Sequence, residues 1–196
     1  MTQKKPLSQM TNEELWQLFP IILREHNPHY GEWYDEERAR LAGLGLPIRR
    51  ISHIGSTAVA GLIAKPTVDI LLETDSSPET LTEKIKKAGW LLMAKNTLPS
   101  GYVFNKGYTP DGFAERVFHL HLRRYGDWDE LYFRDYLTAH ADAAEEYAEL
   151  KLRLAALWRH NRDAYTEAKS ELVKKYTALA RAEFAGRYLP FDTDSK

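Results

Sequence analysis

The residues most able to do chemistry lie in one stretch, residues 50–72, which reads as a strand, a Gly-Ser turn and a second strand. Gly55 allows close backbone approach or a positive φ, and Ser56 and Thr57 add hydroxyl groups beside free backbone N–H groups. This combination suits a phosphate oxygen. Asp69 stands in the apolar second strand, where an acid is rarely buried without a basic partner or a metal. The stretch therefore predicts a polar cleft around the turn and Asp69.

Two histidines further along the chain offer metal ligands. Residues 116–123 alternate as a strand does, so His119 and His121 project to the same face. Together with Asp69 they would form a two-histidine, one-carboxylate site for a divalent metal. The alternative is that both imidazoles only make hydrogen bonds within a polar cleft.

The acids do not follow the usual pattern for two-metal catalysis, in which carboxylates bridge ions about 3.5–4 Å apart. Asp69 is followed two residues later by Leu71 rather than by a second acid. Glu73 shares the face of Asp69, but in an extended strand it lies about 13 Å away. The sequence therefore gives little support to two-metal catalysis of the usual kind.

Basic and aromatic residues could complete a site for a phosphorylated ligand. Lysine and arginine are the usual phosphate partners, and the candidates are Lys65, Arg116, Arg134 and Lys169. Each of these taken alone is better explained as a solvated surface charge. His53, just before the turn, either contacts the phosphate or packs and satisfies backbone groups. Aromatic side chains that could stack on a base, or simply pack, are Tyr102, Tyr108, Phe113 and Trp128.

Composition narrows the class of protein. The 196 residues, 43% of them hydrophobic, suit one domain with a sizeable core. A net charge of −1 argues against a duplex DNA binder, and the absence of cysteine excludes disulfides, thiolate zinc sites and a cysteine nucleophile. No window approaches ~18 consecutive apolar residues, and the N-terminus lacks the apolar core of a signal peptide. We therefore expect a cytoplasmic protein that does not enter a membrane.

Turn signals and apolar periodicity divide the chain into parts. We expect a flexible N-terminus at 1–10, an α/β core at 11–125, a helical region at 126–185 packed on that core, and a tail at 186–196. The core should hold a capped helix from Thr11 and helices at 33–44 and 79–88. Its strands should lie at 48–54, 66–72, 90–94, 102–104 and 116–123, with an exposed loop at 106–114.

The helical region should contain helices at 127–138, 141–157 and 162–184. In the last of these, apolar residues recur at helical spacing, namely Tyr165, Ala168, Leu172, Tyr176, Leu179 and Phe184. A helix on the order of 35 Å long needs a partner along its length, and the preceding helix is the nearest candidate.

Several strings together resemble the GrpB family over roughly residues 20–180. They are His53 to Thr57, Gly61-Leu62, Ala64 to Asp69-Ile70, His119 to Leu122, Leu131 to Leu137 and Tyr165 to Lys169. The Gly-Ser turn followed by a strand acid is similar to the nucleotidyltransferase superfamily, whose fold that family resembles. The resemblance implies an α+β fold, with a nucleotidyltransferase-like mixed sheet, flanking helices and a C-terminal helical hairpin.

The candidate residues, taken together with the nucleotidyltransferase-like fold, predict a function. The expected ligand is a nucleotide or another small phosphorylated molecule, held by His53, Gly55, Ser56, Thr57, Lys65, Arg134 and Lys169. Asp69 would be catalytic, and with His119 and His121 it would bind Mg²⁺ or Mn²⁺ for nucleotidyl or phosphoryl transfer to a small acceptor. No organic cofactor is expected. The alternative is a catalytically inactive module that binds a nucleotide or phosphate.

Overall fold

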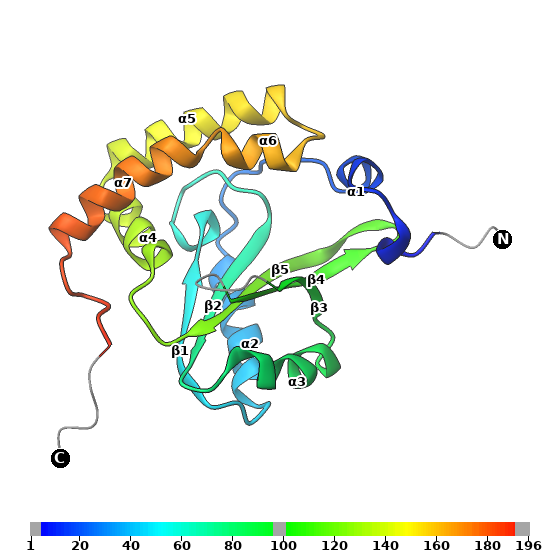
Figure 1. The fold of residues 1–196 in the computed structure, drawn as a ribbon. Coiled ribbons are helices and arrows are strands. Elements are labelled where there is room, and N and C mark those ends of the chain that lie inside the picture. The colour runs from blue at the N-terminus through cyan, green and yellow to red at the C-terminus, as the bar shows by residue number, and fades with distance from the viewer. Residues whose placement is uncertain (1–4, 96–100, 191–196) are drawn as a thin grey trace, which may run out of the picture.

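The computed structural model describes residues 5–95 and 101–190, in which one five-stranded sheet lies between two groups of helices (Figure 1). The strands are β1 Ile48–Ile54, β2 Thr67–Thr74, β3 Leu91–Lys95, β4 Tyr102–Thr109 and β5 Gly112–Arg124. The α-helices are α1 Asn12–Leu18, α2 Tyr30–Ala42, α3 Thr82–Lys87, α4 Asp129–Ala139, α5 Ala141–Leu157, α6 Arg162–Glu167 and α7 Ser170–Glu183. Short 3-10 helices are η1 Leu7–Gln9, η2 Ser56–Ala58 and η3 Pro78–Leu81.

The sheet has the strand order β1-β2-β5-β4-β3 and is mixed. Strands β2 and β5 run parallel, and the other neighbouring pairs are antiparallel. The prediction of an α+β chain with a mixed sheet and flanking helices is confirmed. The capping box also forms, because the Thr11 hydroxyl accepts from the Glu14 amide while the Glu14 carboxylate accepts from the Thr11 amide.

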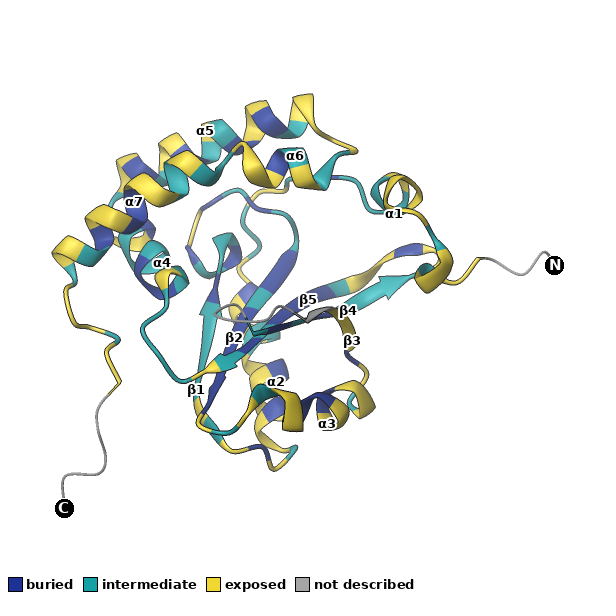
Figure 2. Ribbon diagram, viewed as in Figure 1, coloured by how far each residue is buried: buried dark blue, intermediate teal, exposed yellow. Residues whose placement is uncertain are grey.

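Side-chain alternation gives the two faces of the sheet different partners. Val68, Ile70 and Leu72 of β2 point to one face, where they join the main core with residues of α2 and α3. Asp69 and Leu71 point to the other face, which α4 covers through Leu131. Buried positions accordingly follow the sheet and the inward sides of the helices (Figure 2). Asp69 therefore lies between the sheet and the helical layer.

The helical layer differs from the prediction at its last helix. Residues 162–184 form two helices, α6 and α7, because the chain tightens between them and the Lys169 amide donates to Thr166 O at 3.3 Å, an i→i−3 bond. Tyr165 and Tyr176 are buried as expected, but Leu179 is 45% exposed. The tighter turn changes the angular position of the residues after it, which removes Leu179 from the buried side.

The loop expected at 106–114 is instead the end of a hairpin. Strand β4 continues to Thr109 and β5 begins at Gly112, so the tight connection is Pro110-Asp111. Phe113 and Tyr108 on this hairpin pack against Phe19, with ring centroids 5.0 and 4.7 Å from the Phe19 ring. This aromatic contact orders a segment whose turn residues alone indicated a loop.

The predicted division into parts is only partly covered by the structure. Residues 1–4 of the predicted flexible N-terminus and 191–196 of the predicted tail lie outside the described residues, as does the 96–100 connection between β3 and β4. Among the helices that the structure describes, none is long and apolar enough to cross a membrane.

Candidate functional site

The turn after β1 is built by a glycine that no other residue could replace without a shift. Gly55 has φ 71°, which favours glycine, and a Cβ atom there would lie 2.4 Å from Asp69 Oδ2. The backbone of the turn therefore approaches the Asp69 carboxylate directly. This placement brings together the two features that the sequence predicted to share a cleft.

His53 does not reach the Asp69 face. It alternates to the opposite face of β1, where its ring stacks on Tyr34 at 4.9 Å between centroids. The Thr57 hydroxyl donates to Thr67 O at 3.1 Å, so it accepts from His53 Nε2 at 3.0 Å. Burial lowers the pKa of His53 to about 4, which keeps the ring neutral. His53 and Thr57 thus brace the turn.

Asp69 is joined to Tyr108 through a histidine. Asp69 Oδ1 accepts from His119 Nδ1 at 3.0 Å, and the Tyr108 hydroxyl lies 2.8 Å from His119 Nε2. Burial lowers the pKa of His119, so the neutral ring donates to Asp69 and accepts from the tyrosine. Burial opposes ionisation of Asp69, but the hydrogen bond from His119, followed by nearby positive charge such as that of Lys65, lowers its pKa to about 2.

A β-bulge puts Tyr108 on this face. Asn105 is paired with His119, and the register then shifts between Lys106 and Tyr108. At this shift a single residue of β4, Gly107, stands between the paired positions, against four residues of β5, 114–117. Gly107 has φ 89°, and a Cβ there would lie 2.2 Å from Arg116 O. Regular alternation from Asn105 would place Tyr108 on the opposite face of the sheet.

The three residues predicted to bind a metal lie close together, but their arrangement does not suit a metal site. His121 Nε2 lies 4.0 Å from Asp69 Oδ1, close to the predicted arrangement. Both nitrogens of His119, however, are occupied by Asp69 and Tyr108. Within the part of the chain that the structure describes, no group of three or more His, Asp or Glu side chains is placed to hold a metal ion. The donor set therefore suits a hydrogen-bond chain better than a metal centre.

A buried lysine from the helical layer completes the turn. Lys151 of α5 is 2% exposed, and its Nζ donates to Ser56 Oγ at 3.1 Å and to Ile63 O. Tyr147, one turn earlier, also makes a hydrogen bond to Ser56. Burial, with the nearby charges of Lys169 and Lys65, lowers the pKa of Lys151 to about 7. The Ser56 hydroxyl is thus held by α5.

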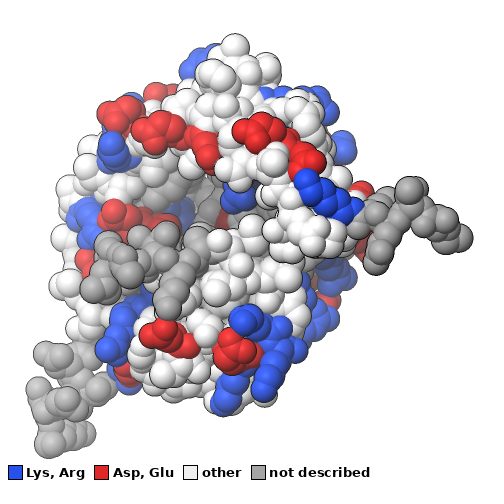
Figure 3. All heavy atoms as spheres, turned by 45° about the vertical axis from the view of Figure 1, so that its right-hand side comes forward, with Lys and Arg blue, Asp and Glu red and all other residues white. Residues whose placement is uncertain are grey.

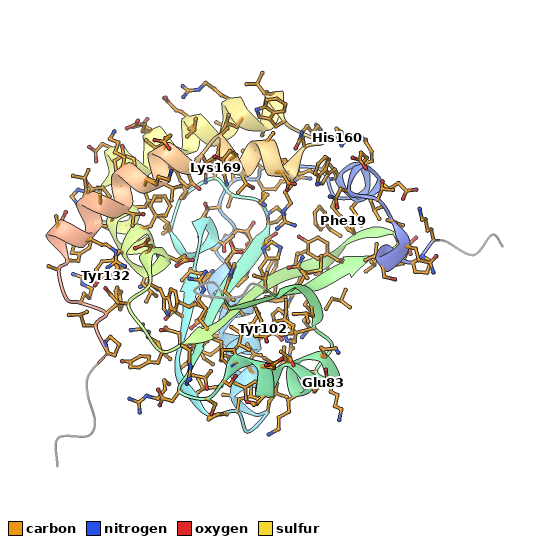
Figure 4. The ribbon with its side chains drawn as sticks, in the orientation of Figure 1. Phe19, Glu83, Tyr102, Tyr132, His160 and Lys169 are labelled. Atoms are coloured by element: carbon orange, nitrogen blue, oxygen red, sulfur yellow. The ribbon has the colours of Figure 1, made fainter. Side chains whose placement is uncertain are left out.

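Three more cationic side chains lie near Lys151. With Lys151 they form what we call the basic cluster: Lys65, Lys151, Arg162 and Lys169. Burial and then Arg162 and Lys169 lower the pKa of Lys65 to about 8. Burial lowers the pKa of Lys169 to about 8 as well, opposed by Asp69 and reinforced by Arg162. Lys169 lies at the junction of α6 and α7 above the sheet (Figure 4). In Figure 3 a hollow opens below the helical layer, with basic atoms visible inside it.

Two other basic candidates have different surroundings. The Arg134 guanidinium is shared among His53 O at 2.9 Å, Asp135 and the Tyr188 hydroxyl, so it connects β1 to α4. Arg116 pairs with Glu36 at 2.7 Å and lies over Trp33 of α2. Neither arrangement supports the predicted phosphate contact.

Glu73 is likewise separate from the site. It is buried and makes a two-point ion pair with Arg50, as expected from its distance along β2. Asp69 therefore has no second acid from its own strand.

The sequence interpretation missed Lys151 and Arg162, and it assigned Tyr108 only to stacking. A signal for Lys151 was present, because the buried positions of α5 fall at helical spacing, namely Ala143, Tyr147, Lys151 and Leu154. A lysine inside such a stripe is rarely buried without a function or a partner. Arg162 carries no comparable signal, since it is the first residue of a short helix.

Comparisons with known proteins agree with this architecture. A UPF0157 protein of Pseudomonas aeruginosa is 38% identical over 78% of this chain and 63% of its own length. UPF0157 protein YqkA of Bacillus subtilis is 35% identical over 85% of this chain and 48% of its own length. This chain thus spans less than two thirds of either relative. The glutamate-rich protein GrpB of Alkalihalophilus pseudofirmus is 31% identical over 78% of this chain and 91% of its own length.

Solved structures extend the comparison to the fold. The crystal structure of the conserved protein GrpB from Enterococcus faecalis has a TM-score of 0.73 at 27% identity, covering 83% of this chain and 99% of that chain. Terminal uridylyl transferase 4 from Trypanosoma brucei aligns more loosely, with a TM-score of 0.47 at 14% identity over 85% of this chain and 57% of that chain. A family model described as GrpB protein matches residues 20–179, which include the turn, Asp69, both histidines and the basic cluster. On this match and these relatives, the chain belongs to the GrpB family.

Proposed function

We propose that this protein binds a small polyanionic ligand, a nucleotide or another phosphorylated molecule, between the basic cluster and the Gly55 turn. The observation that carries the proposal is the convergence of Lys65, Lys151, Arg162 and Lys169. In the described part of the chain, none of the four forms a salt bridge with a carboxylate.

Like charges held close together in a partly buried site repel one another, and folding must overcome that repulsion. Asp69 offsets part of it, since its charge raises the pKa of both Lys65 and Lys169 against the effect of burial. One carboxylate cannot neutralise four cations. A ligand with several negative charges would remove the remaining repulsion, and phosphate oxygens are the natural partners of lysine and arginine.

Metal-dependent transfer is not part of the proposal. The donors around Asp69 do not fit a metal, because both His119 nitrogens are engaged. The binding module without catalysis is thus the form of the function that the geometry favours.

One observation favours a second candidate, acid–base chemistry on the bound ligand without a metal. The hydrogen-bond chain from Asp69 through His119 to Tyr108 could move a proton at the Tyr108 hydroxyl. Incubating the protein with ATP in EDTA and following products by mass spectrometry tests it. Turnover that is lost in Tyr108→Phe would support this candidate, and an unchanged ATP pool would end it.

Calorimetric titration with pyrophosphate and with ATP, in EDTA, tests the binding proposal. We expect binding by the parent protein and a loss of about tenfold or more in Lys169→Gln, because a charge-assisted hydrogen bond contributes about 1.5–3 kcal/mol. Lys169→Gln should at the same time leave the ligand-free protein as stable as the parent or more so, since it relieves repulsion. A matched control is Lys87→Gln, an exposed lysine on α3 beyond the opposite face of the sheet. No binding by the parent, or equal binding by Lys169→Gln and the parent, would refute the proposal.

A further inference from the structure

A large cavity opens beside the basic cluster and extends away from it. It has a volume of about 1190 Å³ and lies between α1, strand β3, the β4–β5 hairpin and α6. Trp16 and Phe19 form one wall, and Phe19 is held against Phe113 and Tyr108 by ring contacts. Figure 4 shows Phe19 between α1 and the hairpin. The wall is therefore an ordered aromatic surface.

The opposite wall is a run of exposed apolar residues on β3. Leu91, Leu92 and Met93 line the cavity and are 46%, 38% and 51% exposed. Phe113, which contacts Phe19, also lines the cavity and is 39% exposed. Four large apolar side chains exposed together around one cavity are typical of a surface that binds an apolar group.

One end of the cavity is basic. Lys65 and Arg162 line it, and both belong to the basic cluster. Tyr108, at the end of the chain from Asp69, lines it as well. The acidic lining residues, Asp163 and Glu167, are exposed positions of α6. The cavity thus joins the proposed anion site to an apolar chamber.

We propose that the ligand is amphipathic, with its phosphate in the basic cluster and an aliphatic group in this chamber. The inference rests on the proposed function and adds the chemical class of the ligand's second half. An aliphatic group fits better than a nucleobase, because most of the exposed lining of the cavity is apolar. A base placed against Leu91, Leu92 and Met93 would bury hydrogen-bonding atoms beside side chains that offer them no partner.

Three probes separate the anion site from the apolar chamber: octyl phosphate, inorganic phosphate and 1-octanol. We expect octyl phosphate to bind at least about tenfold more tightly than inorganic phosphate, since each buried methylene adds affinity. Octanol should bind more weakly than octyl phosphate, because it lacks the anionic head. All three are measured by calorimetry on the full chain, below the micelle concentration of octyl phosphate.

Two matched pairs of variants locate the ligand. Leu91→Ser should weaken the binding of octyl phosphate several-fold and leave the binding of inorganic phosphate unchanged. Leu179→Ser, on α7 and similarly exposed at 45%, should leave both affinities unchanged. Arg162→Gln should weaken the binding of both phosphates. Arg153→Gln, at an exposed position of α5, should leave both affinities unchanged.

Each result decides a different claim. If both phosphates bind equally well, the anion site stands and the apolar chamber is refuted. If octanol binds as tightly as octyl phosphate, the chamber does not serve a charged ligand and the inference is wrong. If neither phosphate binds, the proposed function fails together with the inference.

Discussion

Asp69 is the acid around which the basic side chains of the site are arranged. It accepts a hydrogen bond from His119, and its charge acts on Lys65 and Lys169. Its side chain is 26% exposed, so it lies at the edge of the cleft and not deep in the core. These contacts favour a structural role for Asp69, held by a hydrogen bond and by nearby positive charge, over the metal-ligand interpretation.

Asp69→Asn should therefore destabilise the ligand-free protein. His119 and the surrounding cations hold the pKa of Asp69 at about 2 against the effect of burial, below its value in the unfolded chain. The unfolded state binds more protons between pH ~2 and ~4, so the contribution is complete above pH ~4 and is lost as pH falls towards 2. In urea unfolding, we expect the free energy of unfolding of the parent to exceed that of the variant by about 2 kcal/mol at pH 7 and by less at pH 3.

The same variant tests the metal interpretation. A variant as stable as the parent at pH 7 that has lost a Mn²⁺-dependent ligand affinity would contradict the structural role of Asp69 and restore the metal site.

The lysines should also link stability and binding to pH, in the same sense as Asp69 but in a higher pH range. Burial and mutual repulsion lower the pKa of Lys151 to about 7 and of Lys65 to about 8, below their values in the unfolded chain. The unfolded state then binds more protons between pH ~7 and ~10, so stability should rise with pH across this range. A bound anion restores the charged lysines, so pyrophosphate binding at pH 8 should take up protons. Calorimetry in buffers of different ionisation enthalpy measures this uptake.

Lys151→Met is the control for that linkage. The variant should show a smaller rise of stability between pH 7 and 10 and a smaller proton uptake. The slope is the quantity to compare, because the variant also leaves Ser56 Oγ and Ile63 O without their lysine donor. An unchanged slope would show that Lys151 is not one of the titrating groups.

At the scale of elements, two glycines shape the site. Gly55 lets the β1 turn approach Asp69, and Gly107 lies at the register shift after which Tyr108 points towards His119. The strands alone would deliver Asp69 and His119 to one face, since they are paired in register. The two glycine positions, where the backbone departs from regular strand geometry, decide which other groups lie next to Asp69 and His119.

Gly55→Ala should cost more stability than Gly61→Ala. Both glycines have positive φ, 71° and 75°, but a Cβ at Gly61 would meet nothing within 4 Å. Gly61→Ala should therefore cost only about 1–2 kcal/mol of backbone strain. Gly55→Ala must in addition displace the Asp69 carboxylate from its charge-assisted hydrogen bond, which adds about 1.5–3 kcal/mol. Equal losses for the two variants in urea unfolding would mean that Asp69 moves aside without cost.

That pair also tests the site. Gly55→Ala should weaken pyrophosphate binding while the variant remains folded, and Gly61→Ala should bind as the parent does. Parent-like binding by Gly55→Ala would place the anion elsewhere.

For the whole molecule, the helical layer is what turns one face of the sheet into a site. Helices α4, α5 and α7 share a hydrophobic cluster with the crossing segment after the turn, through Val59 and Leu62. Lys151, Arg162 and Lys169 all come from this layer, and their positions depend on its packing.

Truncating a side chain on the packed side of α7 should lower the stability of the protein, and truncating one on its outer side should not. Tyr176 is 6% exposed and stacks on Tyr136, so Tyr176→Ala should lose about 2–5 kcal/mol, as core truncations do. Leu179→Ala, at 45% exposure, should stay within about 0.5 kcal/mol of the parent. Chemical unfolding measures both, and similar losses for the two variants would contradict the packing of α7.

The sequence by itself determined the elements and part of the site. Alternation and turn signals depend on neighbouring residues, so they predicted β1 at its observed bounds and the meeting of Asp69 with His119 and His121. The fold class was predicted from the family resemblance of the sequence. Only the tertiary structure decided that His53 faces α2 and that Lys151, about a hundred residues after the turn, reaches Ser56. The physical reason is that periodicity is local. A helix sequence shows which side is buried, but packing against the sheet decides which groups meet there.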